Sequence, residues 1–193
     1  MELCFILLTI FFSNSLGQEF PLGEISEWGE HEISSGEATL LSDKKLQITN
    51  FHYDGEGPAA WFMVGKEKDG YTEERVELDG LIIPNEKGSC DILGAYDDEN
   101  ITLTIPKGMK FTDYSYLSVY CIENNHNFGY FRIKDEYAFT TPAPILLVNV
   151  TTGEITQQRD LSEDDAPENC DQENLVRRRR RDLGTPYRKY QLR

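Results

Sequence analysis

The chain has 193 residues, with 34 acidic and 19 basic side chains and a formal net charge of −15 at pH 7. This length allows one domain with a hydrophobic core plus terminal segments. The strong negative charge argues against nucleic acid as a partner of the main body, because the phosphate backbone would be repelled.

Residues 1–17 have the pattern of a secretory signal peptide. Residues 3–12 form an apolar run, and Ser15 and Gly17 are small residues at the two positions that a signal peptidase recognises. We therefore predict cleavage before Gln18 and a protein that is secreted to the extracellular space. A membrane anchor would need a longer segment, since this run spans about 15 Å as a helix and a bilayer core is about 30 Å thick. We expect no membrane span in the rest of the chain.

Residues 23–137 consist of short alternating runs separated by turn residues, among them several Asp-Gly and Lys-Gly pairs. In residues 45–49 and 100–106 the alternation places the apolar side chains on one face of each predicted strand. Residues 59–64 are continuously apolar, which is typical of a strand covered on both faces. No helical period is sustained, so the pattern predicts an all-β fold, either an antiparallel β-sandwich or a small barrel.

The sequence changes character after residue 137. Residues 138–151 contain a Pro-rich break and a candidate last strand at 145–150, and we interpret them as that strand and a linker. From residue 152 to 193 the chain has no aromatic residue before Tyr187 and is first acidic, then basic. Such a composition buries too little apolar area to offset the entropy lost on ordering. We therefore predict a disordered C-terminal tail over residues 152–193.

Several blocks of sequence, in a specific order and spacing, point to a known family. They are His31 ahead of Gly36, NFHYDGEGPAAW at residues 50–61, LTIP at 103–106, LSVYC at 117–121 and NFG at 127–129. Together, over residues 23–133, they resemble the DM-thirteen domain, the module of the Skeletor family of animal extracellular proteins. The resemblance implies an all-β fold and an electron-transfer or redox role centred on Cys121. It also implies a haem-binding DOMON-type partner, because the module often accompanies such domains.

Cys121 lies at the end of a predicted strand. It shares its parity with Leu117 and Val119, so the thiol points to the apolar face. Buried there, it would be a small inert hydrophobic residue. A redox role, in electron transfer or thiol exchange, requires instead that the strand end bring the thiol to the margin between core and solvent, because the thiolate is the reactive species. A thiol enclosed on every side would count against that role.

The remaining cysteines allow a third possibility. If Cys4 is lost with the signal peptide, an odd number remains, Cys90, Cys121 and Cys170. A Cys90–Cys121 disulfide would stabilise the fold by about 3–4 kcal/mol in the chain-entropy model. Cys170 falls in the predicted tail, where an exposed thiol would be capped or would pair with another chain. Redox thiol, disulfide and inert thiol therefore remain open for Cys121.

Other candidate sites are simpler. The sequons at Asn100 and Asn149 predict glycosylation where those residues are exposed. We predict no metal site, because His31, His52 and His126 are scattered and lack the close spacing of metal ligands. No hydrolase signature stands out, and the sequence indicates no particular cofactor.

The basic run at residues 177–181 resembles a furin-type processing site, with cleavage after Arg180 and Arg181. Alternatively, the run binds heparan sulfate or acidic matrix, or it pairs with the acidic segment at 160–173.

We interpret the chain as a secreted β-module associated with the extracellular matrix, with a redox role centred on Cys121. The expected partners are extracellular-matrix or cell-surface proteins. The alternative is a non-enzymatic binding or assembly module in which the cysteine is structural.

Overall fold

The computed structural model describes residues 18–27, 31–66, 80–124, 126–139, 146–148, 155–157, 166–172 and 175, and nearly all of its regular structure is strand. Its elements in chain order are β1 (Phe20–Gly23), β2 (Ser26–Glu27), β3 (Ala38–Leu40), β4 (Lys45–Tyr53), β5 (Ala60–Gly65), β6 (Leu81–Ile82), β7 (Tyr96–Thr104), the short 3-10 helix η1 (Phe111–Asp113), β8 (Tyr116–Cys121), β9 (His126–Arg132), β10 (Leu146–Val148) and β11 (Ile155–Gln157).

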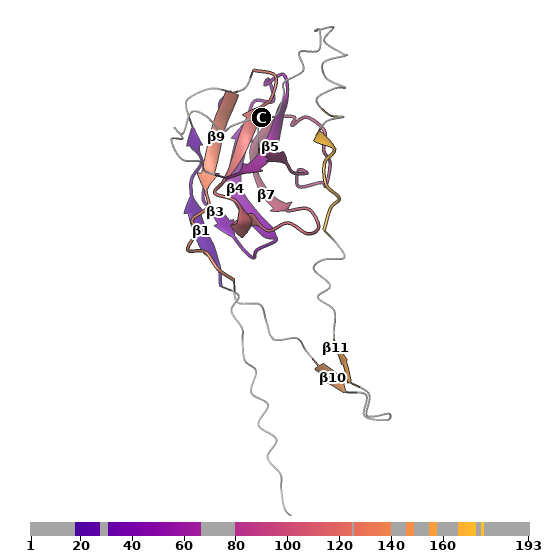
Figure 1. Cartoon of the computed structure of the whole chain (residues 1–193). Coiled ribbons are helices and arrows are strands. Elements are labelled where there is room, and N and C mark those ends of the chain that lie inside the picture. Colours follow the sequence, from indigo (N-terminus) through magenta and orange to yellow (C-terminus); the bar gives the residue numbers. More distant parts are fainter. Residues whose placement is uncertain are drawn as a thin grey trace, which may run out of the picture.

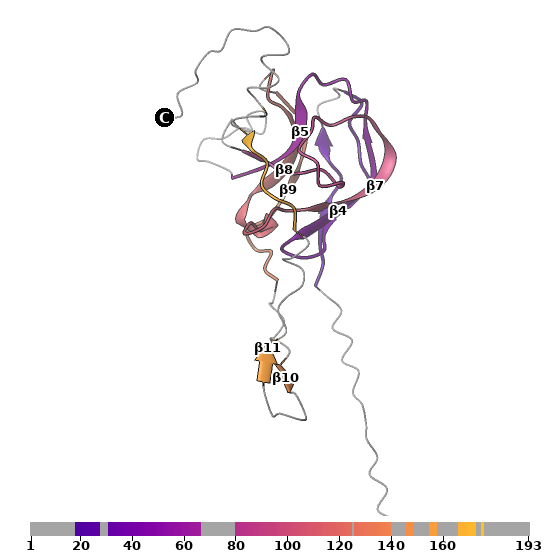
Figure 2. The same cartoon turned by 90° about the vertical axis from the view of Figure 1, so that its right-hand side faces the viewer.

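The strands form two antiparallel sheets that pack as a sandwich (Figures 1 and 2). One sheet has the order β1-β3-β4-β7, and the other has the order β2-β9-β8-β5-β6. Figure 2 shows β4 and β7 on the right of the domain and β5, β8 and β9 on the left. A separate hairpin joins β10 to β11. The predicted all-β fold is confirmed, and it is a sandwich.

The two sheets are covered to different extents. In β4 the residues alternate between buried and more exposed, and Leu46 and Ile48 are fully buried, as the sequence pattern predicted. In β7 the same holds for Ile101 and Leu103. By contrast, every residue of β5 and β8 is buried. The continuously apolar segment 59–64 is therefore covered on both faces, as predicted.

Residues 83–93 and the C-terminal segment account for part of this cover. Ile83 N–H donates to the Phe62 carbonyl and Leu93 N–H to the Ala60 carbonyl, so this segment runs along β5. Cys170 is also buried, at 8% exposure. The second face of β8, with Tyr116, Ser118 and Tyr120, is buried as well.

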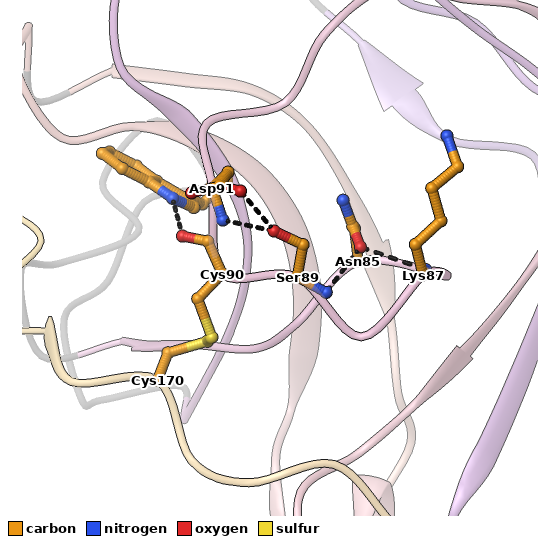
Figure 3. The surroundings of a disulfide bond; sticks show 7 residues. Asn85, Lys87, Ser89, Cys90, Asp91 and Cys170 are labelled. Atoms are coloured by element: carbon orange, nitrogen blue, oxygen red, sulfur yellow. Dashed lines mark hydrogen bonds between the residues drawn. A yellow bond between two sulfur atoms is a disulfide. The ribbon is translucent and has the colours of Figure 1, made fainter.

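Cys170 is covalently linked to Cys90, which lies 80 residues earlier in the chain (Figure 3). Two expectations about the cysteines are therefore wrong. Cys90 does not pair with Cys121, and Cys170 is not an exposed thiol. The tertiary fold brings residues 166–170 back to the domain, where Lys107 N–H also donates to the Pro167 carbonyl, 3.1 Å away.

The C-terminal predictions are tested only in part. β10 lies within the strand predicted at 145–150, and β11 and residues 166–172 lie within the range predicted to be disordered. Apart from Leu175, the rest of that range, including Arg180 and Arg181, lies outside the described residues, and so do the predicted signal peptide and Asn149.

Asn100 lies exposed on β7, on the face that the alternation assigned to it. Its Oδ1 accepts a hydrogen bond from the Asn50 backbone N–H at 2.9 Å. Nδ2, the atom that would carry a glycan, does not take part in this bond. Glycosylation at Asn100 stays a prediction, with a position that is sterically open.

Candidate functional site

The two sequence blocks that carry the family resemblance meet in space. Gly57, in the loop between β4 and β5, donates its N–H to the Tyr53 hydroxyl at 3.0 Å. A Cβ atom on Gly57 would stand 2.6 Å from Cε2 of Phe128, which belongs to β9. The rings of Tyr53 and Phe128 are stacked with centroids 6.1 Å apart. Position 57 therefore requires glycine, because the Tyr53 hydroxyl and the Phe128 ring both lie against the backbone where a side chain would begin.

Cys121 lies beside this contact. It is the last residue of β8, and its cross-strand partners are Ala60 on β5 and His126 on β9. Among the described residues it is the free cysteine, and it is 0% exposed. The expectation of a thiol at the margin between core and solvent is wrong. The strand does end there, but the side chain is fully buried.

The Asn-Phe-Gly block produces a β-bulge. Val119 pairs with Gly129 and Tyr120 pairs with Asn127, so Phe128 is the extra residue on β9. Asn127 Oδ1 accepts the Gly129 N–H at 3.1 Å and so satisfies a backbone donor at the irregularity. Bulges re-aim side chains and are frequent next to functional sites. Here the bulge brings Phe128 against Gly57.

His31 completes the aromatic group. Its ring centroid lies 4.2 Å from that of Phe128 and 6.2 Å from that of Tyr53. Its Nδ1 is 3.2 Å from Asp54 Oδ2, and the Asp54 N–H donates to the His31 carbonyl. His31 and Glu32 both have positive φ, 56° and 46°, a turn conformation that is costly for residues other than glycine. His31, the first residue of the family pattern, therefore holds the loop that follows Tyr53 through its contacts with Asp54.

Burial changes the acid–base behaviour of the tyrosines near the thiol. Desolvation by burial raises the pKa of Tyr53 to about 12, against the lowering effect of the Gly57 N–H, and the charges of Asp54 and Cys121 raise it further. Desolvation by burial also raises the pKa of Tyr120 to about 12. The fold therefore holds both phenols in their neutral, hydrogen-bearing form.

We expect this effect to appear as alkaline unfolding. Because the folded pKa of both phenols lies above the ordinary value of 10, their contribution to stability is complete below pH 10 and is lost as the pH rises to about 12. Phenolate absorbance and circular dichroism recorded along one pH titration would test this. A folded chain in which every tyrosine ionises near pH 10 would contradict it.

A second cluster was missed by the sequence analysis. His52, Asp97 and Asp98 offer ligand atoms that all lie within 4.8 Å of one another, a set that could hold a metal ion. His52 Nδ1 is 3.8 Å from Asp97 Oδ1 and 3.7 Å from Asp98 Oδ1, and the two carboxylates are exposed. Pairing between β4 and β7 brings these residues together. Their spacing along the sequence therefore carried no signal of the cluster.

Within the described part of the chain, no helix is long and apolar enough to cross a membrane.

The fold and the site define a small β-sandwich module in which one free thiol is buried beside aromatic side chains. Residues 26–133 match the family model described as "Electron transfer DM13". This match covers more than half of the chain, so the chain belongs to the DM13 family, as the resemblance predicted, and carries a module of the electron-transfer type.

Two curated proteins are similar to this chain, Protein Skeletor isoforms B/C and isoforms D/E of Drosophila melanogaster. Each is 34% identical to it over 107 residues, which is 55% of this chain. The match spans only 13% of the first relative and 7% of the second, so what the whole relatives do is not transferred here. No solved structure matches the chain.

Proposed function

We propose that the chain is an extracellular electron-transfer module whose redox group is the buried thiol of Cys121. The observation that carries the proposal is that Cys121 is free while Cys90 and Cys170 are bonded to each other. Cys121 is therefore not used in the covalent cross-link that holds residue 170 to residue 90. Membership of the electron-transfer family favours redox chemistry.

The burial of Cys121 selects the kind of redox step. Thiol–disulfide exchange requires an attacking thiolate to reach a sulfur atom directly, and a side chain with 0% exposure offers no such access. Electron transfer requires no direct contact with the partner. Burial also shields the sulfur from peroxide, which oxidises accessible thiolates to sulfenic and higher acids. Complete burial counts against a redox role for Cys121, as the sequence analysis stated, and it excludes thiol exchange. We retain only electron transfer, which needs no direct access to the sulfur, because the family match favours it.

The proposed step is a one-electron oxidation of the thiol. The S–H bond of Cys121 breaks and leaves a thiyl radical. The proton would pass to a nearby base, for which His126 is the candidate because it is the cross-strand partner of Cys121, and the electron would pass to an external one-electron oxidant, which is reduced by one electron. Residues opposite each other on antiparallel strands have Cβ atoms about 4.5–5.5 Å apart.

A chemical oxidant tests the proposal without the partner. Photo-oxidised ruthenium tris(bipyridine) would be generated by a flash in the presence of the full chain, and radicals would be trapped by rapid freezing and identified by electron paramagnetic resonance, which needs no access to the buried sulfur. We expect a sulfur-centred radical in the native protein, and its loss in Cys121→Ala. A native protein that yields radicals elsewhere but no sulfur-centred radical would refute the proposal.

The second candidate is a binding or assembly module with a structural cysteine. The complete burial of Cys121 favours it, because a thiol packed in a core behaves as a small hydrophobic residue. Alkylation does not separate the two candidates, since both predict protection in the folded state. The radical-trapping experiment does separate them, because only the redox module concentrates the radical at the sulfur.

We further propose that the module is secreted and acts with matrix or cell-surface proteins, including a haem-binding protein of the DOMON type. The Cys90–Cys170 disulfide supports an oxidising compartment. Cleavage after Arg181 would leave this disulfide intact, because Cys170 precedes the basic run.

A further inference from the structure

The cluster of His52, Asp97 and Asp98 has no part in the thiol chemistry. His52 lies on β4 between two fully buried residues, and its own side chain is 28% exposed, so the imidazole is on the outer face of its sheet. Its Nδ1 is 3.8 Å from Asp97 Oδ1 and 3.7 Å from Asp98 Oδ1. One partly buried imidazole therefore faces two carboxylates that extend into solvent.

An irregularity in the pairing of β4 with β7 explains why two consecutive aspartates reach one imidazole. The register shifts between two cross-strand pairs, Phe51–Glu99 and Tyr53–Tyr96. Between those pairs His52 stands opposite both Asp97 and Asp98, whereas consecutive residues of a regular strand point to opposite faces. Such a bulge re-aims side chains, and Asp98 has a φ of 52°, which aspartate adopts more readily than most residues. The fold thus turns both carboxylates toward the same ring.

The imidazole is held in place from its other side. The His52 N–H donates to the Ser34 carbonyl at 2.9 Å, and the Ser34 N–H donates to the His52 carbonyl at 3.1 Å, so the backbone is fixed. Glu32 Oε2 lies 3.9 Å from His52 Nε2, and its side chain is 81% exposed. A movement of about 1 Å would let this carboxylate accept the Nε2–H. A carboxylate on the second ring nitrogen fixes the tautomer in which the first nitrogen can bind a metal.

The charges of the cluster favour a cation. Among the described residues, the ion pairs of Glu32, Asp97 and Asp98 all run to His52, and no lysine or arginine pairs with these three carboxylates. The ligand atoms of His52, Asp97 and Asp98 lie within 4.8 Å of one another. Two carboxylates held this close repel each other, and a divalent cation between them would convert that repulsion into attraction.

The types of ligand select the metal. Zinc binds imidazole nitrogen and carboxylate oxygen at about 2.0–2.2 Å, and a tetrahedral arrangement then separates the ligand atoms by about 3.3–3.6 Å. The separations of 3.7 and 3.8 Å exceed this range by only a few tenths, which rotation of the exposed aspartates can supply. Calcium instead prefers six to eight oxygen ligands. The imidazole therefore favours zinc over calcium.

We propose that His52, Asp97 and Asp98 bind a zinc ion, with Glu32 as the residue that positions the imidazole. Three protein ligands leave the fourth tetrahedral position to water. The ion would join β4 to β7, which is the edge strand of its sheet. Because the unfolded chain does not bring these residues together, zinc would stabilise the folded state by mass action. The proposal is independent of the redox role of Cys121.

Titration calorimetry of the full chain with zinc chloride, without a histidine tag, tests the proposal, together with thermal unfolding with and without zinc. We expect one zinc per chain and a raised midpoint. His52→Gln and the double variant Asp97→Asn/Asp98→Asn should weaken binding by more than about 100-fold and abolish the midpoint shift. Glu32→Gln should weaken it by about 10-fold, the lower end of the effect of an outer partner.

Glu99→Gln is the matched control, because it removes one negative charge from an exposed residue of the same strand that is not in the cluster. It should bind zinc as tightly as the native chain. Equal weakening in Glu99→Gln and the double aspartate variant would overturn the proposal in favour of diffuse attraction to negative charge.

Three further outcomes would also overturn the proposal. A native chain that binds no zinc would leave the cluster as a histidine paired with acids. Zinc bound equally by the native chain and both ligand variants would be held elsewhere. Displacement of zinc by calcium at equal concentration would exclude zinc as the preferred ion. The aspartate variants change exposed side chains, so they decide the matter even if His52→Gln fails to fold.

Discussion

Replacing Cys90 and Cys170 with alanine should lower the free energy of unfolding by about 4–5 kcal/mol in the chain-entropy model, because the disulfide closes a loop across 80 residues. The bond also holds a packed segment in place. The Cys90 carbonyl accepts the Trp61 Nε1–H at 3.1 Å, and Trp61 lies on β5, which pairs with the strand β8 that carries the thiol. Urea unfolding of the oxidised full chain would measure the loss.

The single variants provide the control for this experiment. Cys90→Ala and Cys170→Ala each remove the same bond, so either change should cost nearly as much as both together. Costs that add between the two single variants would show that each cysteine stabilises the fold independently of the bond. A double variant as stable as the native chain would show that the Cys90–Cys170 link does not form.

Gly57→Ala should destabilise the fold by about 1–3 kcal/mol, the usual cost of inserting a methyl group into a packed site. The new Cβ would meet the Tyr53 hydroxyl and stand 2.6 Å from Phe128 Cε2, so at least one ring must move. Movement of Tyr53 would break the 3.0 Å hydrogen bond from the Gly57 N–H.

Gly94→Ala is the matched control for Gly57→Ala. A Cβ at Gly94 has no atom within 4 Å, so this variant should unfold close to the native midpoint. Thermal and urea midpoints of the two variants, measured side by side, isolate the effect of the close contact. Equal stability of Gly57→Ala and Gly94→Ala would mean that the aromatic group is loosely packed and does not hold the phenol in one position.

These experiments measure how strongly the Cys90–Cys170 disulfide and the aromatic packing at Gly57 stabilise the domain that contains the free thiol of Cys121. Within the described residues the sulfur is enclosed, so its chemistry depends on neighbours that pass charge through the protein. The family match identifies the module as one of electron-transfer type.

Much of the fold followed from local pattern. The alternation through Ile101 and Leu103 placed β7 correctly, since the period of side chains along a strand is two and does not depend on distant residues. The unbroken apolar run at residues 59–64 identified a strand buried on both faces. The order of the sequence blocks identified the family, because turn and bulge residues such as Gly57 and Gly129 are needed wherever two backbones approach closely.

Contacts between distant segments could not be read in this way. The sequence alone determined an all-β module of this family with Cys121 on the inner face of a strand. Only the tertiary structure decided that Cys90 pairs with Cys170, that the thiol is fully buried, and that the Tyr96 hydroxyl donates a hydrogen bond to Glu86. These facts depend on which segments, tens of residues apart in the sequence, the sandwich brings together. The alternation of side chains within one strand gives no information about that pairing.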